Sequence, residues 1–70
     1  MMIGLALKTI REQRGMSQSE LESLTGLART NLSRLESGHT VPSLNTLALL
    51  AAAYQTTVWK IVKFAEEAKP

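Results

Sequence analysis

Residues 17–38 of this 70-residue chain read SQSELESLTGLARTNLSRLESG. Ser17 and Glu20 have the spacing of a capping box, in which each side chain bonds to the backbone amide of the other residue. Gly26 can end the helix that begins there, because glycine adopts a positive φ with little strain. A second short helix is predicted over about residues 28–37. The stretch therefore predicts two short helices joined by a tight turn.

Outside this stretch, apolar residues recur every three or four positions, which is the period of a helix. The spacing predicts one helix over residues 3–14 and two more within residues 43–68. Ser43 and Thr57 are the expected caps of the last two helices. No alternation of polar and apolar residues persists long enough to indicate a strand. The predicted fold class is all-α, a compact bundle of five short helices.

The side of each helix that is expected to face the core follows from the same spacing. Leu5 and Ala6 lie off the main apolar face of the first helix, so we expect both to be partly exposed. The residues expected to contribute apolar contacts are Ile3, Leu7, Ile10, Met16, Leu21, Leu24, Leu27, Leu32, Leu35, Leu44, Leu47, Leu50, Ala51, Tyr54, Val58, Ile61, Val62 and Ala65.

Composition indicates a single domain over residues 1–70, close to the lower size limit for unaided folding. The chain has no cysteine, so neither disulfides nor thiolate metal sites can support it. No apolar run approaches the roughly 20 residues that span a membrane, and the first residues lack the cationic start of a secretory signal. A cytoplasmic protein without a membrane partner is expected. The net charge of +2 is compatible with nucleic acid but does not require it.

The outward face of the helix over residues 28–37 carries side chains that can contact DNA bases. Arg29 and Arg34 can each form a bidentate pair with guanine, while Thr30 and Ser33 can donate or accept hydrogen bonds. Two helices joined by a short turn that contains glycine are typical of a helix-turn-helix motif. The alternative for both arginines is a role as solvated surface cations.

Enzymatic chemistry finds little support in the sequence. The single histidine, His39, has no carboxylate at a spacing that suggests a Ser-His-Asp arrangement, and it has no second histidine or cysteine with which to hold a metal. No glycine-rich phosphate-binding motif is present. We therefore expect no catalytic site, no metal site, no cofactor and no small-molecule effector.

The sequence resembles the lambda-repressor-like helix-turn-helix family, also called the Xre or Cro-repressor family. The resemblance rests on IGLALKTIREQRGMSQ, EL, TGLARTNLSRLESG and PSLNTLALLA, and it covers about residues 3–62. It implies a five-helix domain that binds operator DNA, usually as a dimer on a palindromic site. A transcriptional regulator that represses by occupying double-stranded DNA is therefore the leading hypothesis.

The resemblance also assigns roles to individual residues. It implies that Arg29, Thr30, Ser33 and Arg34 read bases, and that Arg11 and Glu36 form a buried ion pair between the first and third helices. Gln18 matches the position in the family that contacts a phosphate, and the start of its helix favours an anion. The full set of expected phosphate contacts is Ser17, Gln18, Asn31, Ser37, His39 and Thr40.

The sequence departs from the family pattern at two positions. Glu22 stands where the family has a small residue. It is therefore expected either to turn outward or to pair with a basic residue, with Arg29 and Arg34 as candidates. Ala28 replaces the usual Ser or Thr at the start of the third helix, which costs about 1 kcal/mol of capping. This replacement is expected to leave freer amides there for a phosphate.

Apolar residues that look surplus to one small core suggest a partner surface on the last two helices. The predicted homodimer interface comprises Leu49, Trp59, Lys63 and Phe64. The alternative is that Trp59 covers the edge of its own domain. Two further functions stay open, namely an antitoxin that neutralises a toxin and regulates its own operon, and a restriction–modification controller.

Overall fold

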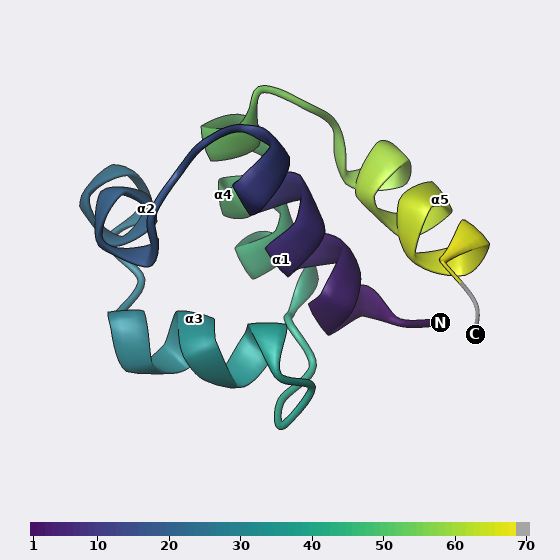
Figure 1. Ribbon diagram of the computed structural model, residues 1–70, viewed down its shortest axis with the longest axis horizontal. Coiled ribbons are helices and arrows are strands. Elements are labelled where there is room, and N and C mark those ends of the chain that lie inside the picture. The colour runs from purple at the N-terminus through teal and green to yellow at the C-terminus, as the bar shows by residue number, and fades with distance from the viewer. Residues whose placement is uncertain (69–70) are drawn as a thin grey trace.

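A computed structural model describes residues 1–68 of the chain, and five helices make up this part (Figure 1). Lys69 and Pro70, which end the predicted domain, lie outside the described residues. No strand occurs in residues 1–68, so the predicted all-α class is confirmed. The helices are α1 (Ile3–Gln13), α2 (Gln18–Thr25), α3 (Arg29–Glu36), α4 (Leu44–Tyr54) and α5 (Val58–Glu67).

Three of the five helices described in residues 1–68, α2, α4 and α5, begin at the polar residues that the sequence indicated. The Ser17 hydroxyl accepts a hydrogen bond from the Glu20 amide at 3.0 Å, and the Glu20 carboxylate accepts one from the Ser17 amide at 3.0 Å. Ser43 and Thr57 cap α4 and α5 in the same way, each through its side-chain oxygen. Only the bonds of Ser17 and Glu20 are reciprocal, but all three caps satisfy an amide that has no partner within its helix.

Helix α1 lies at the centre of the fold, with α3 on one side and α5 on another (Figure 1). Helix α2 packs against α3 and α4, and α4 also packs against α5. The Met2 amide donates to the Ala65 carbonyl at 3.3 Å, so the start of the chain is tied to α5. None of the helices described in residues 1–68 has the length and apolar character needed to cross a bilayer.

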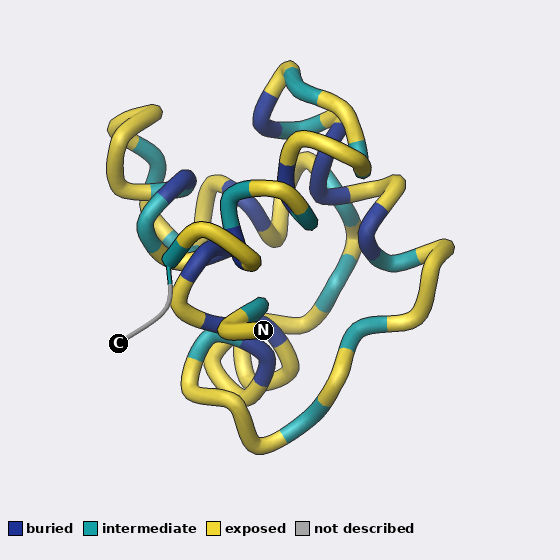
Figure 2. Tube along the Cα trace, turned by 90° about the vertical axis from the view of Figure 1, so that its right-hand side faces the viewer, coloured by how far each residue is buried: buried dark blue, intermediate teal, exposed yellow. Residues whose placement is uncertain are grey.

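One core cluster joins all five helices, and its buried stretches lie on the helix sides that face one another (Figure 2). Tyr54 is the largest fully buried side chain, and burial raises the pKa of its hydroxyl above the ordinary value. The buried apolar residues are Ala6, Leu7, Ile10, Leu21, Leu32, Leu35, Leu47, Leu50, Ala51, Tyr54, Ile61 and Ala65.

Three of the predicted core assignments are wrong. Ala6 is fully buried rather than partly exposed, because α1 is covered by both α3 and α5 and its buried arc is wider than one stripe. Leu24 and Leu44, expected to face inward, are 65% and 72% exposed. Each lies only about 60° around its helix from a buried leucine, Leu21 or Leu47, so periodicity alone does not separate them, and their exposure depends on which helices lie opposite.

A largely buried ion pair joins α1 to α3. Arg11 Nε donates to Glu36 Oε2 at 2.7 Å, and a second guanidinium nitrogen donates to Oε1 at 3.1 Å. The remaining nitrogen donates to the Met16 carbonyl at 2.7 Å. The hydrogen bond to Glu36 raises the pKa of Arg11 further. Because both side chains are about nine-tenths buried or more, this pair holds the end of α3 at a fixed place on α1.

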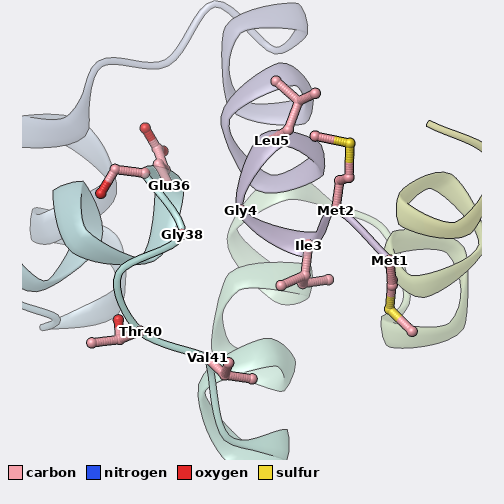
Figure 3. Close-up of a pocket in the computed structure, with 10 residues that line it drawn as sticks. Met1, Met2, Ile3, Gly4, Leu5, Glu36, Gly38, Thr40 and Val41 are labelled. Carbon is pink, nitrogen blue, oxygen red and sulfur yellow. The ribbon is translucent and has the colours of Figure 1, made fainter. Parts of the chain in front are cut away.

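The backbones of α1 and α3 approach each other closely at Gly4, which faces the end of α3 near Glu36 and Gly38 (Figure 3). A Cβ atom on Gly4 would lie 2.5 Å from the Leu35 carbonyl oxygen and 3.0 Å from that of Glu36. Both obstacles are backbone atoms, which cannot rotate away as the end of a side chain can. Any side chain at this position must therefore push the two helices apart.

We predict that Gly4→Ala lowers the free energy of unfolding by about 1–3 kcal/mol, as overpacking does, even though alanine favours helices. Chemical denaturation monitored by circular dichroism measures the change. Ser23→Ala, at an exposed position of α2, is the control, because it adds helix propensity without a steric clash. A Gly4→Ala variant as stable as the parent would contradict the close contact.

We also predict that Glu36→Gln costs about 3–5 kcal/mol of stability, because it leaves the Arg11 guanidinium buried without its counter-charge. The double variant Arg11→Met/Glu36→Gln removes both charges and should recover a substantial part of this loss. Urea denaturation of the two variants and the parent provides the comparison. A loss below about 1 kcal/mol in the single variant would place the pair among ordinary surface ion pairs.

Candidate nucleic-acid interface

A three-residue turn, residues 26–28, connects α2 to α3. Gly26 ends α2 in the left-handed conformation with φ 76°, as predicted. The Thr25 hydroxyl donates to the Leu21 carbonyl at 2.7 Å and accepts from the Leu27 amide at 3.1 Å. Leu27 also packs against the core. The turn is therefore held by hydrogen bonds and by apolar contact, which fixes the angle between the two helices.

Helix α3 separates cleanly into an apolar and a polar side. Leu32 and Leu35 are buried. Within residues 1–68, no side-chain hydrogen bond or ion pair holds the guanidinium of Arg29 or of Arg34, so both can reach outward. The exposed residues on and directly after the helix are Arg29, Thr30, Asn31, Ser33, Arg34 and Ser37. The residues predicted to read bases thus lie together on the exposed side of one helix.

Gln18, the first residue of α2, connects that helix to the ion pair. Its side-chain nitrogen donates to Glu36 Oε1 at 3.1 Å and to the Ser33 hydroxyl at 3.4 Å. The side-chain N–H groups are therefore directed at α3. A phosphate at this end of α2 would be held by the first-turn amides that the capping box leaves unpaired and by the Ser17 hydroxyl proton.

Lys8 is a candidate residue that our reading of the sequence missed. It is exposed on α1, and it lines a hollow of about 330 Å³ together with Gln18, Ser33 and Ser37. It lies three residues before Arg11, and therefore on the side of α1 that faces α3. The spacing of three residues between Lys8 and Arg11 is the sequence feature from which this position could have been predicted. The position of Lys8 adds a cation beside the predicted phosphate contacts at the start of α2.

The loop after α3 brings other predicted phosphate contacts together. The Ser37 hydroxyl donates to the Arg34 carbonyl at 3.2 Å and lies 2.7 Å from His39 Nδ1. Thr40 is half-buried, and Asn31 lines a shallow hollow with Arg34 and Thr40. These side chains therefore form a polar border that runs from Asn31 to the loop after α3.

Glu22 makes a contact that the sequence did not predict. It was expected to turn outward or to pair with a basic residue, with Arg29 and Arg34 as candidates, and it is indeed exposed. Its partner, however, is the backbone of Arg29 and not a guanidinium: Glu22 Oε2 accepts a hydrogen bond from the Arg29 amide at 3.1 Å. Ala28 makes no side-chain cap, as expected, but the start of α3 is less open to a phosphate than predicted, because Glu22 already occupies one amide.

The residues predicted to form a dimer interface differ in exposure. Leu49 is 46% exposed and Trp59 is 61% exposed. The Lys63 ammonium lies 5.9 Å from the centre of the Trp59 ring, within the range of a cation–π contact. Phe64 is half-buried and packs against the core, so the expectation that it is surplus to the core is wrong. Trp59 and Leu49 remain as the accessible apolar side chains of this set.

Comparison with known proteins identifies the family. The helix-turn-helix family model matches residues 7–61. An uncharacterized HTH-type transcriptional regulator of Haemophilus influenzae is 42% identical over 52 residues, which are 74% of this chain and 53% of that protein. The ImmF control region 10 kDa protein of Bacillus phage phi105 is 35% identical over 49 residues, 70% of this chain and 54% of that protein. The chain spans about half the length of these curated relatives.

A solved structure shares the fold over most of the chain. It is the crystal structure of SinR, the master regulator for biofilm formation, in complex with DNA. The superposition has a TM-score of 0.82 with 32% sequence identity, and it covers 87% of this chain and 98% of that one. Since the family model spans most of the sequence and the fold agrees, the chain belongs to the lambda-repressor-like helix-turn-helix family of transcriptional regulators.

Proposed function

We propose that the chain is a repressor that binds a palindromic operator in double-stranded DNA as a dimer and acts by occupying it. The observation that carries the proposal is the exposed polar side of α3, where Arg29, Thr30, Ser33 and Arg34 are all accessible. These side chains can read base edges by hydrogen bonding, and the threonine methyl can contact thymine.

The dimensions of α3 suit the major groove. Its eight residues give a length of about 12 Å, and a helix with its side chains is about 10–12 Å across. The major groove of B-DNA is about 12 Å wide and admits such a helix. Leu32 and Leu35 anchor the opposite side of α3 in the core, so the polar side can enter the groove while the helix stays in place.

Phosphate contacts on both sides of α3 would fix its orientation in the groove. On one side are the first turn of α2, with Ser17 and Gln18, and the ammonium of Lys8. On the other side is the loop that contains Ser37, His39 and Thr40. Contacts of this kind set the register of the protein on DNA, while base contacts set the specificity.

The comparisons support this proposal at the level of the family. SinR, which shares the fold, is bound to DNA in its crystal structure, and the relative in Haemophilus influenzae is described as a transcriptional regulator. Selection of bound duplexes from a random pool is the direct test. A bound palindrome with half-sites about 34 Å apart would support a dimer that places two copies of α3 in successive major grooves.

The dimer would form through α4 and α5, where Leu49 and Trp59 leave apolar surface exposed. A tryptophan at the centre of an interface commonly contributes more than any of its neighbours. Lys63 lies close to the Trp59 ring and can border the same surface. These positions are separate from the exposed side of α3, so dimerisation and DNA binding would not compete.

We predict that Arg34→Ala weakens binding to the selected operator and relaxes the preference at one base pair by about 1–3 kcal/mol. Titration of the operator and of its single-base variants measures both effects. Lys60→Ala on α5 is the matched control, since it removes one exposed positive charge outside the proposed reading surface. If both variants lost the same affinity on every DNA sequence, Arg34 would contribute only a non-specific positive charge.

We predict that Trp59→Ala shifts the protein towards monomer, with a cost of about 2 kcal/mol or more, which corresponds to roughly 30-fold in the dimer dissociation constant. Sedimentation equilibrium over a range of concentrations measures this constant. Leu24→Ala, at an equally exposed apolar position on α2, should leave it unchanged. A monomeric parent protein, or an unaltered dimer in the Trp59 variant, would refute this interface.

A further inference from the structure

We infer that Glu22 is a positioning residue for DNA recognition, because its carboxylate caps α3 from the neighbouring helix and fixes the first residue that reads bases. This inference rests on the proposed function. The observation is the 3.1 Å hydrogen bond from the Arg29 backbone amide to Glu22 Oε2. It coincides with the absence of any side-chain cap from Ala28, the residue at which a cap normally stands.

The start of a helix needs hydrogen-bond acceptors that this sequence does not supply locally. The first amides of a helix have no partner within it, and the helix dipole makes a negative charge favourable there. Alanine has no side-chain oxygen and cannot accept these bonds. Glu22 lies seven residues before Arg29, one turn from the end of α2, and its carboxylate meets both requirements from outside α3.

The location of this bond distinguishes it from an ordinary cap. A cap at residue 28 would belong to the turn itself, whereas the Glu22 carboxylate joins α2 directly to α3 across the turn. Arg29 contributes the bonded amide and also carries the first outward-facing guanidinium of α3. The bond therefore fixes the backbone position from which the Arg29 side chain projects, relative to α2. The first turn of α2 is the one that would hold a phosphate.

Because Glu22 is negatively charged, the two possible roles predict opposite changes in DNA affinity when it is removed. If Glu22 were only an exposed acid beside DNA, its removal would reduce repulsion from the phosphates and tighten binding. If Glu22 positions α3, its removal weakens binding although the protein becomes more positive. Because the Arg29 amide already donates to this carboxylate, Arg29 would contact DNA through its side chain.

The experiment compares four variants at the start of α3, and a charge control on α5, on the operator obtained from the random pool. Glu22→Gln keeps an oxygen that can accept from the Arg29 amide but removes the charge. Glu22→Ala removes both. Glu22→Ala/Ala28→Ser restores a conventional cap within the turn, which bonds later amides of α3, without restoring the link to α2. Ala28→Ser alone keeps Glu22 in place and serves as the matched control.

We expect Glu22→Gln and Ala28→Ser to bind the operator at least as tightly as the parent. Glu22→Ala should bind about fivefold more weakly, because Arg29 is then no longer held in place relative to α2; fivefold corresponds to about 1 kcal/mol. The double variant should regain the stability of the parent in urea denaturation and yet still bind weakly. Glu66→Ala on α5, which removes the same charge elsewhere, should not weaken binding.

Parental or tighter binding by the double variant would overturn the inference, because Glu22 would then act only through helix stability or repulsion. Amide hydrogen exchange adds a readout that does not involve DNA. Exchange at the Arg29 amide should accelerate several-fold in Glu22→Ala and in the double variant, but not in Glu22→Gln. If no duplex is selected from the pool, the proposed function fails, and the exchange data still decide whether Glu22 holds α3.

Discussion

The carboxylate of Glu36 is the point on which the arrangement of the first three helices depends. Its two oxygens accept hydrogen bonds from Arg11 on α1 and from Gln18 on α2, while Glu36 itself ends α3. A charge so largely buried would destabilise the fold if it lacked partners. Here both oxygens are bonded, and the guanidinium has a further acceptor in the Met16 carbonyl. One side chain thereby joins three helices that a small apolar core alone would leave less well defined.

The two ends of α3 are held by different kinds of contact. At its C-terminal end, Glu36 is bonded to α1 and α2, and Gly4 lets the α1 backbone approach the last carbonyls of the helix. At its N-terminal end, the Glu22 carboxylate accepts from the Arg29 amide. Buried leucines hold the helix along its length. A helix of only eight residues is not stable alone in water, so its usefulness as a reading surface depends on these contacts.

The two departures from the family pattern explain each other in the structure. Ala28 cannot cap α3, and Glu22 is larger than the small residue with which the family lets α2 and α3 approach closely. The glutamate at the crossing supplies the acceptor that the alanine lacks. Considered separately, each residue looked unfavourable for the motif. Considered together, they replace a cap within the turn by a bond between helices, and this exchange is visible only when both helices are in place.

The sequence by itself determined the helices, the caps of α2, α4 and α5, and the polar side of α3. These features depend on residues three or four apart, such as Ser17 with Glu20, or on one residue, such as Gly26, so local chemistry is sufficient to predict them. The Arg11–Glu36 pair was anticipated only through resemblance to a family, because its members are 25 residues apart.

Tertiary structure decided everything that depends on which helix lies opposite which. It buried Ala6, exposed Leu24 and Leu44, brought Lys8 beside the start of α2, and gave Glu22 a backbone partner. It also made Gly4 a point of close approach, which no feature of the neighbouring sequence indicated. Periodicity states which side of a helix is apolar, but the width of the buried arc and the partners of its polar residues depend on the packing of other helices.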